Sequence, residues 1–383
     1  MSRAVTGSDV YLIGGACLSV RKQHTESLRR MGAQSLLAAL ADAAVESPDM
    51  LIVANMLADE LDGQKHLGPL IATEAGIQGI EALQVRAAMA TGAAAIRMAY
   101  LALKSGEVRT VAITGLERMS SGDPTPIMAR ALDAETEIPA GQTMVSINAH
   151  IMEKYLMTYN AEYEQFANFA VNAHRNALSN PDALLHKQVN VADVLKAREI
   201  VTPIRLYDCA PICDGSASIV LTNDATLARK QNGIQLLASE TVCDSLAVAA
   251  RAQPLELNAA RQSAQKAYRR AGIEPTDVDF FELHDAFSIM ACLALEACGF
   301  AEPGAGWKLA AEGDIFLEGK IPIATFGGLK ARGHPIGATA IYQAIEIYRQ
   351  LRGQAGMNQI SNARCAMMQS IGGAGTTLIT NIF

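Results

Sequence analysis

Short apolar runs alternate with longer amphipathic segments along most of the chain. The runs at 9–15, 51–57 and 108–115 are typical of buried strands, and the segments at 27–45 and 87–103 carry apolar residues at helical spacing. Further strand-like runs lie at 215–224, 234–242 and 363–370. Because strands alternate with helices, we predict an α/β protein with a mostly parallel sheet covered by helices on both faces.

The segment 120–205 departs from this alternation. It is rich in polar and aromatic residues and in long helical stretches, such as EKYLMTYNAEYEQFANFAVNAHRNAL. We therefore predict a mainly helical insertion at 120–205, which interrupts an N-terminal half formed by 1–119 and 206–231. A C-terminal half is predicted at 232–383.

The C-terminal half resembles the N-terminal half in its pattern. MATGAAA opens a helix that precedes the strand VRTVAITG, and HPIGATA at 334–340 opens a helix that precedes ARCAMMQS at 363–370. Gly92 and Gly337 then occupy like positions, unless two similar βαβ pieces arose by chance. A true repeat would bring two helix N-termini near a shared centre, where they favour developing negative charge.

Composition excludes several functions. The chain has 383 residues, half of them apolar, which is enough for two or three packed units. Its net charge of −7 is spread out with no basic cluster, which argues against nucleic-acid binding. The N-terminal apolar run is too short for a signal peptide, no run would span a bilayer, and the terminal TNIF is no peroxisomal signal. We expect a cytoplasmic protein without membrane contact.

Seven cysteines are spread along the chain, and none lies in a CxxC pair. Cys209 and Cys213 are separated by three residues, but no further His or Cys pair completes a zinc pattern. We therefore predict no metal site and seven reduced thiols, most of them buried, in a reducing compartment.

Three segments carry residues suited to catalysis. In FGGLKARGHPIGATA (326–340), His334 stands at the mouth of a helix, where an imidazole can act as general acid or base or donate to an oxyanion. In FFELHDAFSIMA (280–291), His284 and Asp285 follow a predicted strand. The alternatives are a Gly-rich connection with a surface histidine, and an Asp285 that merely caps the next helix.

The third segment is SIGGAGTT (370–377), whose consecutive glycines follow a predicted strand. The backbone N–H groups of Gly372 and Gly373 could form half of an oxyanion hole, and a tight turn is the alternative. Three further histidines, at 150, 174 and 186, lie in the insertion, where structural or surface roles are expected.

Together and in this order, these segments resemble the thiolase superfamily, and most of all its archaeal and sterol-carrier-protein-type members. The resemblance covers nearly the whole chain and is carried by GQKHLGPLIATEAGI, TGLERMS, CAPICDGSASIVL, ELHDAF, GGLKARGHPIGATA and SIGGAGTT. It implies a thiolase fold, in which duplicated βαβαβαββ halves stack as a five-layer αβαβα sandwich with an inserted loop domain that holds coenzyme A. It also implies C–C bond formation or cleavage on acyl-CoA thioesters.

The resemblance assigns roles residue by residue. His334 matches the GHP histidine that activates the nucleophile, His284 matches the HDAF histidine that holds the thioester oxygen, and Gly372 and Gly373 match the glycine turn beside them. Met89 occupies the position of the nucleophilic cysteine. The second catalytic cysteine is also missing, because its two family positions fall on Ala286 and on the segment 369–371.

A thioether cannot lose a proton, attack a thioester or carry an acyl group, so ping-pong acyl transfer through Met89 is not expected. Thr91 is a weak alternative nucleophile, and by composition alone Met89 could simply fill the core. Three hypotheses remain: an acyl-CoA enzyme without the covalent step, such as a retro-aldolase of β-hydroxyacyl-CoA; a thiolase that has lost its nucleophile; and a non-catalytic acyl-CoA-binding or scaffold subunit.

The resemblance also implies partners. Coenzyme A enters as the thioester substrate and not as a covalently bound cofactor. A homodimer or tetramer is implied, together with a possible small partner protein that carries an OB fold and a zinc ribbon. The contacts to coenzyme A and the acyl chain are not predicted from the sequence.

Overall fold

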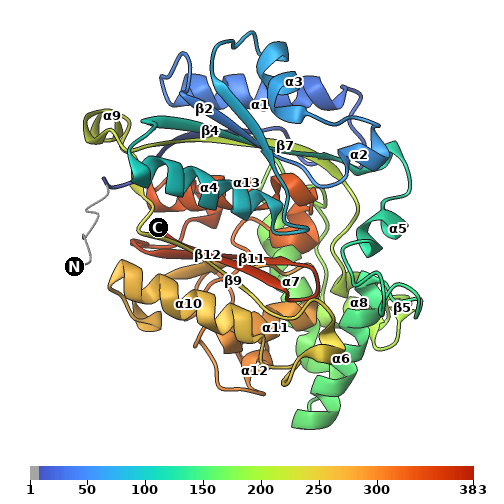
Figure 1. The fold of residues 1–383 in the computed structure, drawn as a ribbon. Coiled ribbons are helices and arrows are strands. Elements are labelled where there is room, and N and C mark those ends of the chain that lie inside the picture. Colours follow the sequence, from blue (N-terminus) through green and yellow to red (C-terminus); the bar gives the residue numbers. More distant parts are fainter. Residues whose placement is uncertain (1–7) are drawn as a thin grey trace, which may run out of the picture.

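The computed structural model describes residues 8–383. Residues 1–7, which begin the predicted half 1–119 and the segment judged too short for a signal peptide, lie outside the described residues. The two halves each form a sheet, and the two sheets are stacked (Figure 1).

The first sheet has six strands in the order β3-β2-β4-β7-β1-β8. The strands are β1 (Tyr11–Cys17), β2 (Met50–Ala54), β3 (Glu81–Val85), β4 (Thr110–Arg118), β7 (Asp214–Thr222) and β8 (Ile234–Gln235). The second sheet has the order β10-β11-β12-β9, with β9 (Ala238–Cys243), β10 (Phe280–Glu282), β11 (Ala366–Gly372) and β12 (Thr377–Ile382).

Helices form three layers that alternate with the two sheets (Figure 1). Helices α1 (Leu28–Asp42) and α3 (Leu67–Glu74) cover the outer face of the first sheet, and α4 (Thr91–Ser105) and α13 (Thr339–Leu351) lie between the sheets. Helix α10 (Asn258–Ala271) covers β9 and β12 on the outer face of the second sheet, with α11 (Ser288–Ala297) beside it. The five-layer αβαβα sandwich is therefore confirmed.

The internal repeat is visible in the sheet topology. In the first half β2 is parallel to β3 and β4, and β7 is antiparallel to β4 and β1. In the second half β10 is parallel to β11, and β12 is antiparallel to β11 and β9. A single parallel bridge between Phe281 and Ile323 takes the place of the β2–β3 pairing. The two halves thus share one strand order, which confirms the repeat.

Two expectations about strands were wrong. The sheets are mixed and not mostly parallel, because β7 in the first half and β12 in the second run antiparallel to both of their neighbours. The predicted strand 234–242 is two strands in two different sheets: β8 pairs with β1, and β9 pairs with β12. An apolar run shows that a segment is buried, but it does not show which sheet buries it.

Gly92 and Gly337 meet where the two halves touch. A Cβ on Gly92 would lie 2.9 Å from the carbonyl oxygen of Gly337, and a Cβ on Gly337 would lie 2.5 Å from that of Ala54. Buried Glu117 reinforces this contact, because its carboxylate accepts hydrogen bonds from the Gly337 N–H (2.9 Å) and the Leu57 N–H (2.9 Å). Glycine at both positions therefore allows α4 and α13 to start close together.

The segment 120–205 is mainly helical. It contains α5 (Pro124–Ala129), α6 (Met144–Tyr159), α7 (Ala167–Ala177), α8 (Val191–Leu195) and a ribbon of β5 (Glu199–Val201) and β6 (Ile204–Arg205). The remaining short helices are α2 (Ala58–Leu61), α9 (Ala225–Lys230) and α12 (Gly306–Ala311).

Four asparagines spaced four residues apart join the insertion to the second half. Each side-chain amide donates to a main-chain carbonyl, in the pairs Asn168–Ala310 (3.0 Å), Asn172–Ile323 (3.0 Å), Asn176–Ala324 (3.0 Å) and Asn180–Phe326 (2.9 Å). The last three of these amides satisfy the edge of the segment 323–326, where the first half has a complete strand. They also fix the start of the Gly-rich segment that leads to His334.

Candidate active site

Met89, His284 and His334 line one pocket. The pocket is largely apolar, and five methionines from separate elements contribute to it. Its lining comprises Met89, Met119, Thr125, Met128, Thr143, Met144, Val145, Asn148, Cys209, Ala210, Pro211, Ile212, His284, Ala286, Phe287, Met290, His334, Ile371 and Gly373. Residues from both halves and from the insertion therefore converge on a single cavity.

Met89 lies in a tight turn in front of α4. The predicted helix 87–103 begins only at Thr91, because Ala88 adopts a left-handed conformation (φ +49°) and the Ala87 carbonyl accepts the Ala90 N–H at 3.0 Å. Such a backbone is unfavourable for alanine and holds the side chain of residue 89 in one direction. Met89 is 8 % exposed, lines the pocket and precedes the positive end of the α4 dipole.

The hydroxyl of Thr91, the alternative nucleophile, is engaged in the turn that precedes α4. It donates to the Ala88 carbonyl (2.6 Å) and accepts the Ala87 N–H (2.9 Å), and the side chain is fully buried. Because both hydrogen bonds stabilise the turn, Thr91 has a structural role that fixes the position of Met89.

The rings of the two histidines pack against each other in a T-shaped, edge-to-face arrangement. The ring centroids of His284 and His334 are 5.0 Å apart with an interplanar angle of 88°. His284 lies two residues after the end of β10, and His334 lies between the short helices η6 (Gly328–Arg332) and η7 (Ile336–Ala338). Nδ1 of His334 is 2.7 Å from the Thr339 hydroxyl, whereas Nδ1 of His284 is buried without a partner.

Both imidazoles are held uncharged. Burial, followed by the nearby Arg332 charge, lowers the pKa of His284 to about 3. Burial, then His284 and Arg332, lowers the pKa of His334 well below its usual value. At neutral pH the site therefore offers two neutral imidazoles, each able to accept a proton or donate a hydrogen bond.

We expect acid to destabilise the fold through these two histidines. Both folded pKa values lie below the unfolded value near 6.5, so the contribution of the two histidines to stability is complete above pH 6.5 and is lost as the pH falls, for His284 down to about pH 3. Each histidine should cost about 1.4 kcal/mol per pH unit in that window. The free energy of unfolding, measured with urea at several pH values between neutral and pH ~5, should fall less steeply with decreasing pH for His284→Asn than for the unmodified chain. Equal slopes would contradict this prediction.

The glycine segment forms a turn beside Met89. Gly372 ends β11 and accepts the Thr376 N–H at 3.0 Å, and Gly373 (φ +65°) lines the pocket. A Cβ on Gly372 would lie 2.7 Å from the Ala87 carbonyl, so glycine permits this hairpin to approach the Met89 turn. The segment therefore forms the tight turn that was considered as an alternative, and this turn places Gly373 at the candidate site.

Asp285 does not cap α11, contrary to the alternative considered for it. The residue before α11 is Phe287, and no side chain caps that helix. Asp285 is buried and accepts the Leu329 N–H at 2.7 Å, so it holds the Gly-rich segment instead. Burial raises its pKa.

The two places where the family carries its second catalytic cysteine, Ala286 and the segment 369–371, both reach the pocket, but neither supplies a thiol. Ala286 and Ile371 line it, while Gln369 is turned towards the Ala260 carbonyl and Thr380. Cys209 also lines the pocket, which the sequence did not predict. Burial raises the pKa of Cys209 to about 11, so its thiol stays protonated and a poor nucleophile.

The insertion supplies other pocket residues. Asn148 is buried, and its side-chain N–H donates to the Met144 carbonyl (2.8 Å). Of the three histidines in the insertion, His174 is buried against the Lys187 carbonyl, His186 lies 2.8 Å from the Asn180 carbonyl, and His150 is exposed. None of them lines the pocket, in line with the structural or surface roles expected.

The seven cysteines are unpaired, and no three His, Cys, Asp or Glu side chains within 8–383 are grouped so that they could hold a metal ion. No helix in the same range is long and apolar enough to cross a bilayer.

Stacked duplicate halves with a histidine pair between them define an enzyme of the thiolase type. A family model described as "Thiolase, N-terminal domain" matches residues 15–225, and one described as "Thiolase C-terminal domain-like" matches residues 240–383. The chain therefore belongs to the thiolase superfamily. An acetyl-CoA acetyltransferase of Methanothermobacter thermautotrophicus is 37 % identical over 98 % of this chain and 99 % of its own length. Human sterol carrier protein 2 is 28 % identical over 89 % of this chain and 65 % of its own length.

Solved structures share the fold. The Ltp2-ChsH2(DUF35) aldolase superposes with a TM-score of 0.85 at 22 % identity, covering 97 % of both chains. Human mitochondrial 3-ketoacyl-CoA thiolase in complex with CoA gives a TM-score of 0.76 at 15 % identity, covering 98 % of this chain and 97 % of its own. At these identities the two likenesses establish the fold alone.

Proposed function

We propose that this protein makes or breaks C–C bonds of acyl-CoA thioesters through an enolate, without a covalent acyl-enzyme. The observation that carries the proposal is the pocket that Met89 shares with His284 and His334. A thioether at the nucleophile position removes the covalent step, while two neutral imidazoles retain acid–base chemistry. The acyl-CoA substrate class is supported by membership of the family and by the name of its archaeal acetyltransferase relative.

Retro-aldol cleavage of a β-hydroxyacyl-CoA is the reaction this arrangement suits best. One imidazole accepts the β-hydroxyl proton, the bond between C2 and C3 breaks, and its electron pair moves into the thioester as an enolate. A hydrogen bond from the other imidazole, the Gly373 N–H and the α4 dipole would stabilise the enolate oxygen. Protonation at C2 then gives a shorter acyl-CoA and a ketone or aldehyde. The Met-rich lining suits an apolar acyl chain.

The test is to incubate the protein with a panel of β-hydroxyacyl-CoA thioesters. Carbonyl and acyl-CoA products would be separated by chromatography, and the intact protein would be weighed by mass spectrometry. Cleavage with an unmodified protein mass supports the proposal. An acyl adduct on any residue overturns the non-covalent mechanism. Binding without turnover across the panel would instead indicate a non-catalytic acyl-CoA-binding or scaffold subunit.

We also propose a homodimer formed through β3. This strand is the edge of the first sheet and exposes Leu83 (56 %), and α4 beside it exposes Met98 and Leu101. An exposed apolar edge strand is a template for pairing with a second copy. Light scattering should give twice the chain mass of 40.6 kDa for the unmodified protein and the monomer mass for Leu83→Asp.

Leu37→Asp is the matched control for the dimer. Leu37 is similarly exposed, at 47 %, but lies on α1 on the outer face of the first sheet. This variant should remain dimeric. If both variants dissociate, or if the unmodified protein is a monomer, the β3 interface is wrong; four times the chain mass would indicate a tetramer with a second interface.

A small partner protein with an OB fold and a zinc ribbon is proposed as well. The name of the Ltp2-ChsH2(DUF35) aldolase, which joins two components, supports a partnered assembly for a protein of this fold. Co-purification should recover such a partner together with one equivalent of zinc. A fully active protein free of zinc and of any second chain would argue against it.

A further inference from the structure

The glycine turn beside Met89 is held from outside the pocket by the segment 244–251. This segment follows β9 and contains the short helix η4 (Val248–Ala250). It contacts the turn between β11 and β12, where the Asp244 N–H donates to the Thr376 carbonyl (2.8 Å) and the Thr376 hydroxyl donates to the Leu246 carbonyl (3.3 Å). No residue of the segment 244–251 lines the pocket, so these contacts reach the candidate site through the turn.

Arg251 links this segment to the turn most directly. Its guanidinium donates from Nη1 to the Ala374 carbonyl (2.6 Å) and from Nη2 to the Thr376 hydroxyl (3.1 Å). The same guanidinium also bonds its own segment, since Nε donates to the Ser245 carbonyl (3.1 Å) and Nη2 to the Leu246 carbonyl (3.4 Å). Arg251 is 8 % exposed, so these charge-assisted hydrogen bonds form with little competition from water.

Two glycines allow Arg251 and Thr376 to approach the turn closely. Gly373 and Gly375 both have a positive φ, of +65° and +96°. A Cβ on Gly375 would lie 3.0 Å from Nη1 of Arg251, and a Cβ on Gly373 would lie 3.1 Å from Oγ1 of Thr376. The guanidinium and the hydroxyl therefore pack directly against the backbone of the turn, whose Gly373 lines the pocket.

A buried carboxylate joins the segment 244–251 to the segment 120–205. Glu137 is 8 % exposed, and it accepts the Val248 N–H (2.9 Å) through Oε1 and the Asp133 N–H (3.1 Å) through Oε2. The backbone that carries Arg251 is therefore tied to its surroundings independently of the glycine turn. The position of the guanidinium is set by the protein interior and not by a side chain that moves freely in solvent.

We propose that Arg251 is a positioning residue that fixes the glycine turn, and with it the Gly373 N–H, in the place from which it binds the enolate oxygen. Glycine gives a backbone the most conformational freedom, so a turn made largely of glycine needs an external anchor. A donor to an oxyanion acts through its preset position, and a misplacement of about 1 Å can cost roughly 10²-fold in rate. The inference rests on the proposed enolate chemistry for its effect on rate, whereas the order of the turn is measurable without any reaction.

The test removes the guanidinium and then supplies it again. In Arg251→Ala we expect kcat for β-hydroxyacyl-CoA cleavage to fall about 10- to 100-fold with KM within about twofold, because the lost interaction belongs to the transition state. Millimolar guanidinium chloride should restore part of kcat, since the free cation can occupy the vacated site, and the same concentration of sodium chloride should not. Amide hydrogen exchange of 372–377, followed by mass spectrometry, should become faster in Arg251→Ala and slow again with guanidinium.

Two further variants test the hydrogen bonds themselves, and they remain informative if Arg251→Ala does not fold. Arg251→Lys keeps the charge but loses the planar fork of donors, so kcat should still fall. Thr376→Val removes the acceptor of Nη2, and kcat should fall in the same direction. Because Thr376→Val and Arg251→Ala break the same hydrogen bond, their effects on kcat should be less than additive in the double variant.

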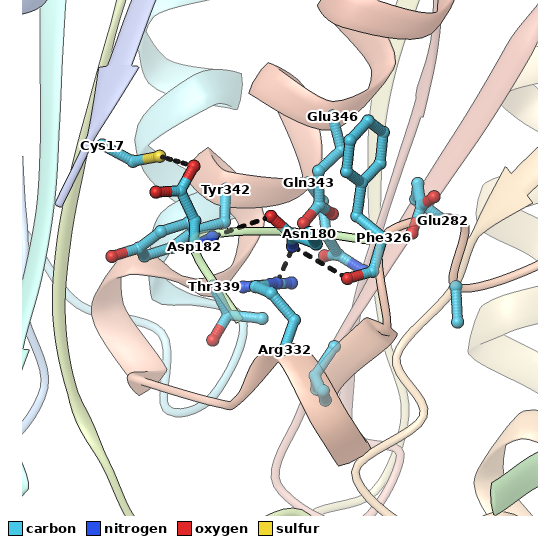
Figure 2. A network of polar contacts seen from close by, with 12 residues as sticks. Cys17, Asn180, Asp182, Glu282, Phe326, Arg332, Thr339, Tyr342, Gln343 and Glu346 are labelled. Carbon is cyan, nitrogen blue, oxygen red and sulfur yellow. Dashed lines mark hydrogen bonds and ion pairs between the residues drawn. The ribbon is translucent and has the colours of Figure 1, made fainter. Parts of the chain in front are cut away.

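Arg349→Lys is the matched control for the loss of a guanidinium. Arg349 lies on α13 and pairs with Asp182 at 3.4 Å. Asp182 belongs to a separate polar network that also holds the Cys17 thiol (Figure 2). Arg349→Lys should therefore leave kcat and the amide exchange of 372–377 unchanged.

Several results would overturn the inference. Unchanged amide exchange of 372–377 in Arg251→Ala would exclude the anchoring role, and full kcat in Arg251→Lys would exclude the role of the hydrogen bonds. An equal loss of kcat in Arg349→Lys would indicate a general effect of losing a guanidinium. A loss confined to KM would assign Arg251 to substrate binding. If the unmodified protein cleaves no substrate, the proposed function fails, and the exchange experiment still decides whether Arg251 anchors the turn.

Discussion

Met89→Cys is expected to convert the pocket into one that forms a covalent acyl-enzyme. The turn around Ala88 and Thr91 already directs residue 89 into the pocket, in front of α4, and His284 and His334 line the same cavity. A cysteine there gains a neutral imidazole to accept its proton and a helix N-terminus to stabilise the thiolate. We expect a stoichiometric acyl adduct from acetyl-CoA and the appearance of acetoacetyl-CoA thiolysis, where the unmodified protein shows neither.

Met119→Cys is the matched control for this experiment. Met119 lines the same pocket and is 2 % exposed, but it follows β4 and does not precede a long helix. The adduct would be located by peptide mapping in a Cys209→Ser background, because Cys209 is a thiol in the same pocket. If Met89→Cys and Met119→Cys are acylated equally, position 89 has no special activating effect on the thiol, which contradicts the prediction. Robust thiolysis by Met89→Cys, with no cleavage of β-hydroxyacyl-CoA by the unmodified chain, would indicate a thiolase that has lost its nucleophile.

The second large effect is expected from the histidine pair. His284→Ala or His334→Ala should lower kcat for β-hydroxyacyl-CoA cleavage by about 10²- to 10³-fold, because each removes either the base or a donor to the enolate oxygen. The double variant should lose little more than the worse single variant, since the two imidazoles act on the same step. Steady-state kinetics on the panel substrate measures both effects.

His150→Ala controls for general effects of histidine removal. His150 lies on α6 of the insertion and is exposed, so kcat should stay within about twofold of the unmodified value. Retention of full activity by both His284→Ala and His334→Ala would remove the chemical basis of the proposed function. A loss confined to KM would assign the pair to binding instead.

Periodicity and motif order predicted much of the fold. The alternation of strands and helices and the repeat that relates Gly92 to Gly337 both follow from local patterns, and the structure confirms them. The direction of each strand and the sheet to which it belongs were not predictable in the same way. The segment 234–242 is divided between two sheets because pairing partners distant in the chain compete for it, and local sequence does not encode that choice.

The candidate site was predicted in part. Met89, His284, His334 and Gly373 were each found through a motif, and they line one pocket. The thiol of Cys209, the amide of Asn148 and the methionine lining were not found, because they come from segments with no recognisable pattern. The asparagines spaced by four from 168 to 180 were a readable signal, since amides repeated at this spacing need hydrogen-bond partners wherever they are buried.

The sequence by itself determined which chemistry is absent, because the atoms of a methionine at position 89 and of an alanine at position 286 cannot form a thiolate in any fold. Only the tertiary structure decided which groups remain to act. The uncharged state of His284 and His334 depends on burial and on the charge of Arg332, which are properties of packed neighbours and not of residue type.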